Sequence, residues 1–225
     1  MEEIKIDRII RSSRKTYGME INKKGELIVR VPNRASDKAI HKMLDKKKKW
    51  ILSKQELVRK RCEQKHPREF AEGEEFLYLG NNYKLYVLDR NRPHLHFNDN
   101  CFVLSRDAIE RAESIFTRWY RQQAHKIFLE RTKHYSSAAG IRYNRISIKD
   151  TRTRWGSCSG RDNLNFNWHL VMAPLNIIDY VVVHELSHIE EKNHSKKFWD
   201  KVISIMPDYK NHRNWLKENG HSLFF

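Results

Sequence analysis

The sequence predicts an α+β fold in which a mixed sheet packs on one long helix and on a helix that carries an HExxH motif. Apolar and polar residues alternate in short strand-like segments, apolar residues recur at helical spacing in two long segments, and a mainly apolar run over 174–192 has the length of a third helix. With 225 residues, 39% of them hydrophobic, the chain can bury one good core and a second small one. We expect parts at 1–70, 71–106 and 107–225 that together form one compact unit.

The N-terminal part is predicted to begin with short strands over residues 3–32. Gly25 lies in a turn between residues 19–21 and the alternating residues 27–31. Pro32 ends the second strand, because proline has no N–H to donate to a sheet. This part is therefore a strand pair followed by a helix.

That helix, predicted over residues 37–62, is strongly basic. Ile40, Leu44 and Ile51 are spaced to form an apolar stripe, and the densest run of charge is residues 46–49, four consecutive lysines. Residues 1–62 contain 19 Lys and Arg against 8 Asp and Glu, so most of the formal net charge of +16 arises there. A solvated helix face explains such a run, and so does a surface that docks nucleic acid or an acidic partner.

The middle of the chain is predicted to form a small antiparallel sheet or hairpins and then a long helix. Residues 76–79, 83–88 and 101–104 are strand-like, and a turn signal occupies residues 80–82. The helix is expected over residues 107–135. Its buried face is expected to carry Ala112, Phe116, Trp119, Gln123 and Ile127.

Two strand-like segments, 145–149 and 164–170, precede the third helix. Between them, Gly156 and Gly160 permit turns or a close approach of backbone. The helix over 174–192 has Pro174 at a favourable first position. Because residues 177–183 are rich in β-branched side chains, a buried strand is the competing interpretation of this run.

Residues 184–188, His-Glu-Leu-Ser-His, carry the clearest chemical signal. On a helix, His184 and His188 lie on one face and can bind one ion, whereas on a strand they would lie about 13 Å apart. His194 follows after Asn193, a residue that tolerates the left-handed conformation and so lets the chain turn back. Three imidazoles can bind Zn²⁺ and leave a fourth coordination position open. They can also bind Ni²⁺, Co²⁺ or Cu²⁺. A five-residue motif also arises by chance.

The pattern predicts metal-assisted hydrolysis of peptide bonds. Glu185, next to His184, is placed to accept a proton from water as a general base. An extended peptide is expected to pair with the sheet edge formed by residues 151–157, which adds Arg154, Trp155 and Gly156 as candidate substrate contacts. The stabiliser of the tetrahedral oxyanion is left open among Tyr180, Tyr209 and His212, and Tyr180 is also a candidate substrate contact.

A second class of function competes with this one. The same zinc site could be structural, in a binding module that docks nucleic acid or an acidic partner through residues 1–62. Glu185 discriminates between the two classes, because a purely structural site needs no base beside its ligands. A combined interpretation, a protease brought to nucleoprotein by its basic helix, rests on charge and on analogy alone.

Several residues receive a structural rather than a chemical interpretation. Cys158 is expected to be a small buried hydrophobe rather than a thiol in the cleft, and His169 to face solvent. Phe198 and Trp199 are expected to pack in the core behind His194, at the start of a helix capped by Ser195.

Composition also excludes some classes of protein. The three scattered cysteines argue against a disulfide framework and are expected to be reduced thiols. No segment has 18 consecutive apolar residues and the N-terminus lacks a leader pattern, so we expect a cytoplasmic protein that does not enter the membrane.

Taken as a set, these motifs resemble the YgjP-like metallopeptidases, bacterial and archaeal zincins related to the SprT-like group. The resemblance implies a zincin fold in which His184, His188 and His194 match the zinc ligands and Glu185 matches the base. His169 departs from the family pattern, where a basic Arg is expected. The resemblance is carried by residues 11–16, 49–51, 154–158, 167–168, 173–174, 179–188, 193–195 and 198–199.

Overall fold

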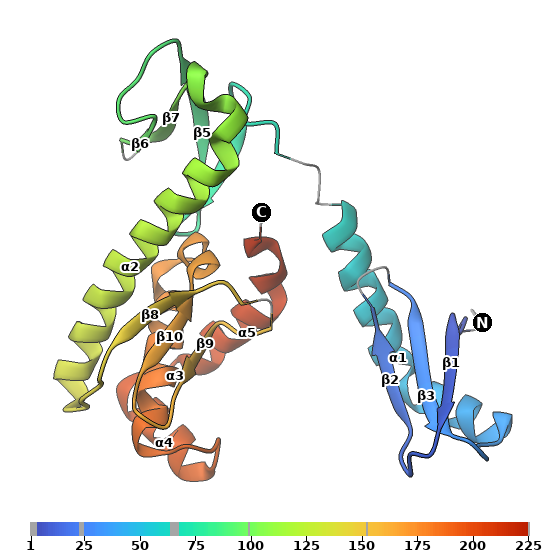
Figure 1. The fold of residues 1–225 in the computed structure, drawn as a ribbon. Coiled ribbons are helices and arrows are strands. Elements are labelled where there is room, and N and C mark those ends of the chain that lie inside the picture. Colours follow the sequence, from blue (N-terminus) through green and yellow to red (C-terminus); the bar gives the residue numbers. More distant parts are fainter. Residues whose placement is uncertain (1–3, 23–24, 64–67, 99, 152, 225) are drawn as a thin grey trace. The chain divides into compact units, whose positions relative to one another are not determined.

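The computed structural model describes residues 4–22, 25–63, 68–98, 100–151 and 153–224. The chain divides into two compact units, Met1–Pro67 and Arg68–Phe225 (Figure 1). The division at residues 70 and 106 stays a prediction. Within the described ranges, no helix combines the length and the apolar character that crossing a lipid bilayer requires. Strands and helices occur in both units, which confirms the α+β class.

The first unit contains a three-stranded sheet. Its strands are β1 (Arg8–Ser12), β2 (Gly18–Ile21) and β3 (Leu27–Pro32), in the order β1-β3-β2. The central strand β3 pairs parallel with β1 and antiparallel with β2. Gly25 has a φ of 83°, a conformation open to glycine, which confirms the turn expected between β2 and β3.

Helix α1 (Asp37–Glu63) covers this sheet with one apolar stripe. Ile40, Leu44 and Ile51 are buried against alternate residues of β3, as the spacing predicts. Lys46, Lys47 and Lys49 are exposed. The unit therefore has a small core of its own and a basic, solvated helix surface.

The second unit begins with a four-stranded sheet formed by β4 (Glu75–Tyr78), β5 (Asn81–Leu88), β6 (Leu95–Phe97) and β7 (Cys101–Ser105). The order is β4-β5-β7-β6. The hairpin alternative is confirmed for β4 and β5, which pair antiparallel. A wholly antiparallel sheet was wrong, because β5 and β7 run parallel. The chain between them forms β6, which pairs antiparallel with β7 and is too short to show a periodic pattern in the sequence.

Helix α2 (Ala112–Ala139) follows a 3-10 turn at Arg106–Arg111 and runs along the whole unit (Figure 1). The predicted face was wrong after Phe116: Trp119, Gln123 and Ile127 are only partly buried. Each four-residue step turns the buried stripe by about 40°, so the stripe winds round the helix as its neighbours change. The buried positions are Ala112, Phe116, Tyr120, Ala124, Phe128, Thr132 and Ser136.

Two aromatic pairs show which neighbours α2 meets along its length. Near its start, Phe116 stacks on Phe76 of β4 with ring centroids 4.2 Å apart. Further along, Phe128 stacks on Phe166 at 4.3 Å with rings almost parallel. One helix therefore joins the first sheet of the unit to its second.

That second sheet consists of β8 (Ile146–Lys149), β9 (Gly156–Cys158) and β10 (Leu164–Asn167), in the order β8-β10-β9. The central strand β10 pairs parallel with β8 and antiparallel with β9. The strand predicted over 164–170 is shorter than expected, because the Asn167 side chain accepts the backbone N–H of His169 and starts a 3-10 turn at Trp168–Met172.

The chain ends with α3 (Leu175–Glu190), α4 (Lys196–Ile205), α5 (Tyr209–Asn219) and a 3-10 turn at Gly220–Leu223. The helix interpretation of 174–192 is confirmed, although Pro174 precedes the first helical residue. A Cβ on Gly80, in the β4–β5 turn, would lie 2.8 Å from Cγ of Pro174. Glycine thus allows the first sheet to pack directly against the start of α3.

A buried ion pair fastens α2 to α3. Arg131 donates from Nε and Nη2 to the two carboxylate oxygens of Asp179, at 2.6 and 2.8 Å. The hydroxyl of Tyr135 donates to the same carboxylate at 3.2 Å. Asp179 lies five residues before His184, so this pair fixes the helix that carries the HExxH motif.

We expect Asp179→Ala to lower the free energy of unfolding of the second unit by about 3 kcal/mol, because Arg131 keeps a buried charge without its partner. Urea denaturation followed by tryptophan fluorescence measures this change. The exposed pair Arg106–Asp89 provides the control, since Asp89→Ala should cost less than about 1 kcal/mol. Equal losses in the two variants would contradict a fastening role for Asp179.

Candidate metal centre

Helix α3 and the segment after it place three imidazoles together. His184 and His188 lie one turn apart near the end of α3, and His194 lies in the segment that leads to α4. The expected left-handed Asn193 was wrong: the described non-glycine residues with positive φ are Phe70, Leu79 and Asp162. The chain instead leaves the helix at Glu191, which is extended with φ −124° and ψ 99°.

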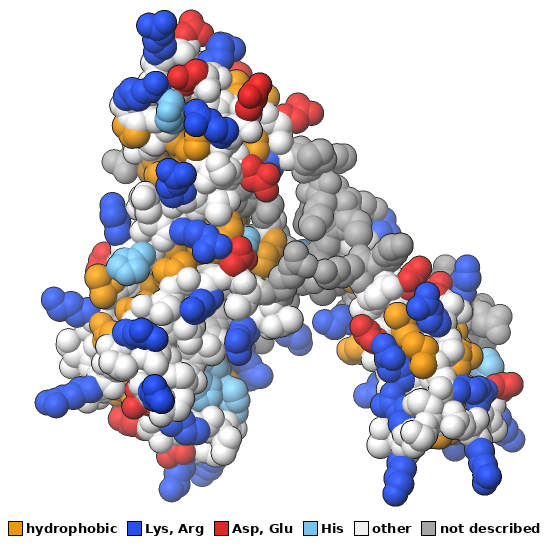
Figure 2. All heavy atoms as spheres, in the orientation of Figure 1, with side chains coloured by type: hydrophobic (Ala, Val, Ile, Leu, Met, Phe, Trp, Pro, Cys, Tyr) orange, Lys and Arg blue, Asp and Glu red, His pale blue; other side chains and the backbone are white. Residues whose placement is uncertain are grey.

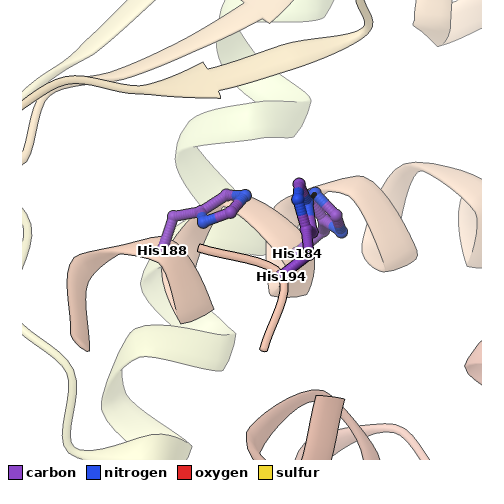
Figure 3. Close-up of side chains that lie close together, drawn as sticks. All are labelled: His184, His188 and His194. Atoms are coloured by element: carbon purple, nitrogen blue, oxygen red, sulfur yellow. Dashed lines mark hydrogen bonds between the residues drawn. The ribbon is translucent and has the colours of Figure 1, made fainter. Parts of the chain in front are cut away.

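The three rings offer nitrogen atoms that all lie within 4.8 Å of one another (Figure 3). Nε2 of His184 and Nε2 of His194 are 3.0 Å apart. His184 and His188 are partly buried, whereas His194 is exposed. The group is therefore open to solvent on the side of His194.

Aromatic rings pack against the three histidines from α4. Phe198 is fully buried, and its ring centroid lies 5.0, 4.5 and 4.7 Å from those of His184, His188 and His194. Trp199 lies beside His194 at 5.7 Å. Ser195 accepts the backbone N–H of Phe198 and caps α4 as expected. The core role predicted for Phe198 is confirmed, and Trp199 is partly buried.

The donor set fits a divalent transition-metal ion. Nδ1 of His188 donates to the carbonyl of Glu191 at 3.0 Å, which leaves the lone pair of Nε2 free for a ligand bond. Nδ1 of His184 is buried and has no hydrogen-bond partner among the described residues. Burial, with the neighbouring histidines, lowers the pKa of His184 to about 3 and also lowers that of His188. Both rings are therefore neutral, the form in which imidazole binds metal.

Glu185, the residue after His184, lies against strand β9. It is 5% exposed, and a Cβ on Gly156 would lie 2.5 Å from its Oε1 and 2.6 Å from its Cγ. The backbone N–H of Cys158 donates to its carboxylate. The side chain thus lies directly against the sheet edge, in space that exists because residue 156 has no side chain.

Burial raises the pKa of Glu185 to about 8, and the charge of Arg154 and the Cys158 N–H oppose this effect. A cation held by the three imidazoles would act in the same direction as Arg154, because a nearby positive charge favours the ionised carboxylate. Burial therefore raises the proton affinity of Glu185, and nearby positive charge lowers it.

The remaining predicted substrate contacts divide into two groups. Arg154 is exposed and close enough to affect the charge of Glu185, and Gly156 contacts that carboxylate. Trp155 instead packs on the C-terminal turn: its ring lies 5.3 Å from that of Phe224, and a Cβ on Gly220 would lie 3.0 Å from it. The Trp155 side chain thus has a packing role here.

Among the three oxyanion candidates, Tyr180 lies nearest the histidines. Its ring is 5.9 Å from that of His184, and burial raises its pKa to about 12, so its hydroxyl stays protonated. Tyr209 stacks on Trp199 at 5.1 Å. His212 lies 3.0 Å from the Asp208 carboxylate and 3.4 Å from Asn176, which engages both of its ring nitrogens.

Sequence reasoning missed two contributors to this region. Arg213 of α5 holds its guanidinium 4.9 Å above the Trp199 ring, and its charge helps to lower the pKa of His184. The main-chain N–H of Cys158 was also missed, because a backbone group carries no signal in the sequence. The Cys158 thiol is half-buried, and burial raises its pKa. Arg213 follows Tyr209 by four residues on a helix, a spacing that could have indicated a shared face.

A known protein family matches most of the chain. The family model of the YgjP-like, metallopeptidase domain matches residues 15–219. The chain belongs to the YgjP-like metallopeptidase family. It is therefore a hydrolase of the metallopeptidase class, a class that acts on peptides or proteins with the help of a metal. No curated protein matches this YgjP-like sequence.

Two solved structures of archaeal metallopeptidase zymogens show limited similarity to this YgjP-like metallopeptidase. Pyrococcus abyssi abylysin is 18% identical, with a TM-score of 0.37 over 40% of this chain and 93% of that chain. Methanocaldococcus jannaschii jannalysin is 19% identical, with a TM-score of 0.37 over 41% and 95%. These likenesses are too slight to carry the description of the fold.

His169 does not face solvent, so that prediction was wrong. It is 6% exposed and its ring stacks on Trp168 with centroids 3.6 Å apart. Its Nδ1 lies 3.0 Å from Oδ1 of Asn167. Burial lowers its pKa to about 4, with Asp150 opposing and Arg121 adding to the effect. His169 is thus a neutral, packed side chain at the end of β10.

This burial predicts a dependence of stability on pH. The pKa of His169 is lower in the folded protein than its ordinary value of 6.5, so its contribution is complete above pH 6.5 and is lost as pH falls toward 4. Between pH 7 and pH 5 the loss amounts to about 2 kcal/mol. Urea denaturation at both pH values measures the free energy of unfolding. The loss between pH 7 and pH 5 should be about 2 kcal/mol smaller in His169→Gln than in wild type. An equal loss in the two proteins would contradict the lowered pKa of His169.

Proposed function

We propose that this chain is a zinc-dependent peptidase in which Glu185 is the general base. The observation that carries the proposal is the arrangement around α3: three imidazoles converge on one side, and the adjacent carboxylate lies against the edge strand β9. A structural zinc site would need only the imidazoles. A buried carboxylate held by a backbone N–H beside them supports a catalytic site.

His184, His188 and His194 would hold the ion, and zinc bound there supplies Lewis acidity that polarises a carbonyl and makes water more acidic. Glu185 accepts the proton of the attacking water at its carboxylate and donates it to the leaving amine. The buried ring of Phe198 packs against all three imidazoles and would hold them in position. Tyr180 is our candidate for the hydrogen-bond donor to the oxyanion, since its phenol stays protonated.

Strand β9 is our candidate for the substrate-binding edge. It pairs with β10 on one side and is the outer strand of its sheet in the described part of the chain. An extended peptide that adds to β9 would run past the Glu185 carboxylate, because Gly156 of that strand contacts it. Arg154, at the start of this edge, would then meet the same peptide.

Two substitutions separate metal binding from catalysis. Glu185→Gln should retain near-stoichiometric zinc and lose peptide cleavage, because it removes the proton acceptor and leaves the three imidazoles. His194→Ala should lose zinc and cleavage together. Elemental analysis of each purified protein, with an assay on an unfolded protein substrate, measures both properties. Full activity of Glu185→Gln would contradict the proposed role of Glu185. Stoichiometric nickel, cobalt or copper instead of zinc in the wild-type protein would contradict the proposed metal.

The contact between Gly156 and Glu185 gives a sharper test. Gly156→Ala should displace the carboxylate and lower kcat/KM by about 100-fold while zinc content stays unchanged, because a displacement of 1 Å suffices for such losses. Gly160→Ala is the matched control, since a Cβ there meets nothing within 4 Å. Its activity should stay within about threefold of wild type. If both variants kept full activity, the placement of Glu185 against β9 would not matter for catalysis.

A second candidate function, docking of nucleic acid by the first unit, rests on the exposed lysines of α1. Replacing Lys46, Lys47, Lys48 and Lys49 with Gln should weaken binding of a short DNA duplex and reduce its salt dependence, because fewer phosphates are neutralised. Fluorescence anisotropy across a salt series measures both. Binding that is unchanged by the substitutions and insensitive to salt would refute this docking role.

A further inference from the structure

An open groove separates α2 from β8, and the proposed active site makes no use of it. The groove has a volume of about 1040 Å³, and every residue of β8 lines it together with one side of α2. The helix contributes residues between Ser114 and Lys126, a length of about 18 Å at the rise of an α-helix. The groove is thus as long as an extended segment of five or six residues.

The side chains that line the groove are basic. Arg118 and Lys126 of α2 and Lys149 of β8 are exposed, and no ion pair engages them among the described residues. Arg121 also lines the groove and pairs with Asp150 at 2.9 Å. No aspartate or glutamate is part of the described lining. Figure 2 shows Lys and Arg side chains gathered along the face formed by α2 and β8.

Strand β8 offers an unpaired main-chain edge in the described sheet, in addition to the basic side chains. It pairs with β10 on one side, and in the described sheet no strand pairs with it on the other. Its outer edge therefore presents main-chain N–H and C=O groups to the groove. A strand added there would lie about 4.8 Å from β8, and its alternate side chains would face α2.

We propose that this groove binds an extended acidic polypeptide segment as an additional strand on β8. The open edge recognises the main chain, and Arg118, Lys126 and Lys149 recognise carboxylates on alternate residues. A polypeptide suits the groove better than single-stranded nucleic acid, because its lining among the described residues includes no Phe, Tyr or Trp to stack on bases. The site is separate from β9, which lies at the opposite edge of the same sheet.

The test uses the full-length Glu185→Gln protein, so that the probe is not cleaved and the result does not depend on peptidase activity. The probe is a fluorescein-labelled peptide of five Glu-Thr repeats, which places every carboxylate on one side of a strand. Fluorescence anisotropy should give at least tenfold weaker binding when Arg118→Glu and Lys126→Glu are added. A peptide of the same composition with five Glu followed by five Thr should also bind at least tenfold more weakly.

The matched control carries Lys84→Glu and Arg90→Glu, which remove the same charge from exposed positions in and just after β5, outside the groove. Its affinity for the probe should stay within about threefold of that of the Glu185→Gln protein. Equal losses in the groove and control variants would overturn the proposal, because net charge alone would then explain binding.

Two further probes test what kind of molecule binds. A Glu-Thr peptide with N-methyl groups on alternate amides should lose at least tenfold in affinity, since it cannot pair with β8; unchanged affinity would overturn the added strand. A fluorescein-labelled ten-nucleotide oligothymidine should bind with an affinity that the groove substitutions change no more than the control substitutions. If the groove substitutions selectively abolished its binding, the occupant would be nucleic acid and not an acidic peptide.

Discussion

The burial of α3 on nearly all of its sides is the constraint on which the rest of the second unit depends. Val181, Val182 and Val183 are buried one after another, so they face neighbours in different directions. Such a helix cannot rotate without losing contacts, because protein interiors are close-packed. Between Ile177 and His188, only His184 and His188 are partly buried rather than buried, and their position is therefore set by the packing of the apolar residues around them.

The ion pair of Arg131 with Asp179 further restricts the position of α3 relative to α2. Apolar contacts tolerate small shifts, whereas two parallel hydrogen bonds from a guanidinium to a carboxylate define one geometry. Because α2 also stacks on both sheets of the unit, the pair places α3 relative to β9 as well. The distance between the Glu185 carboxylate and the sheet edge follows from this arrangement.

The two edges of the β8-β10-β9 sheet have different surroundings, and this difference gives them different chemistry. The β9 edge meets the buried carboxylate of Glu185 on α3, a setting suited to proton transfer. The β8 edge meets cationic side chains on α2, a setting suited to holding anions without transforming them. A single small sheet can thus serve two extended segments, one proposed as substrate and one as an acidic ligand.

Local patterns of residues were enough to predict several elements of the fold. The strands β2 and β3, the stripe of Ile40, Leu44 and Ile51 on α1, and the helix around the HExxH motif all follow from periodicity and from backbone preferences of Gly and Pro. The convergence of His184 and His188 is of this kind, since a helix brings residues four apart together. Features that depend on contacts between distant segments became visible in the folded chain alone.

Parallel pairing of β5 with β7, the winding buried face of α2 and the burial of His169 belong to that second group, because no local spacing encodes a partner. The contact of Glu185 with Gly156, 29 residues apart in sequence, belongs there too. This contact arises from the packing of α3 against β9, and no pattern in either segment predicts it.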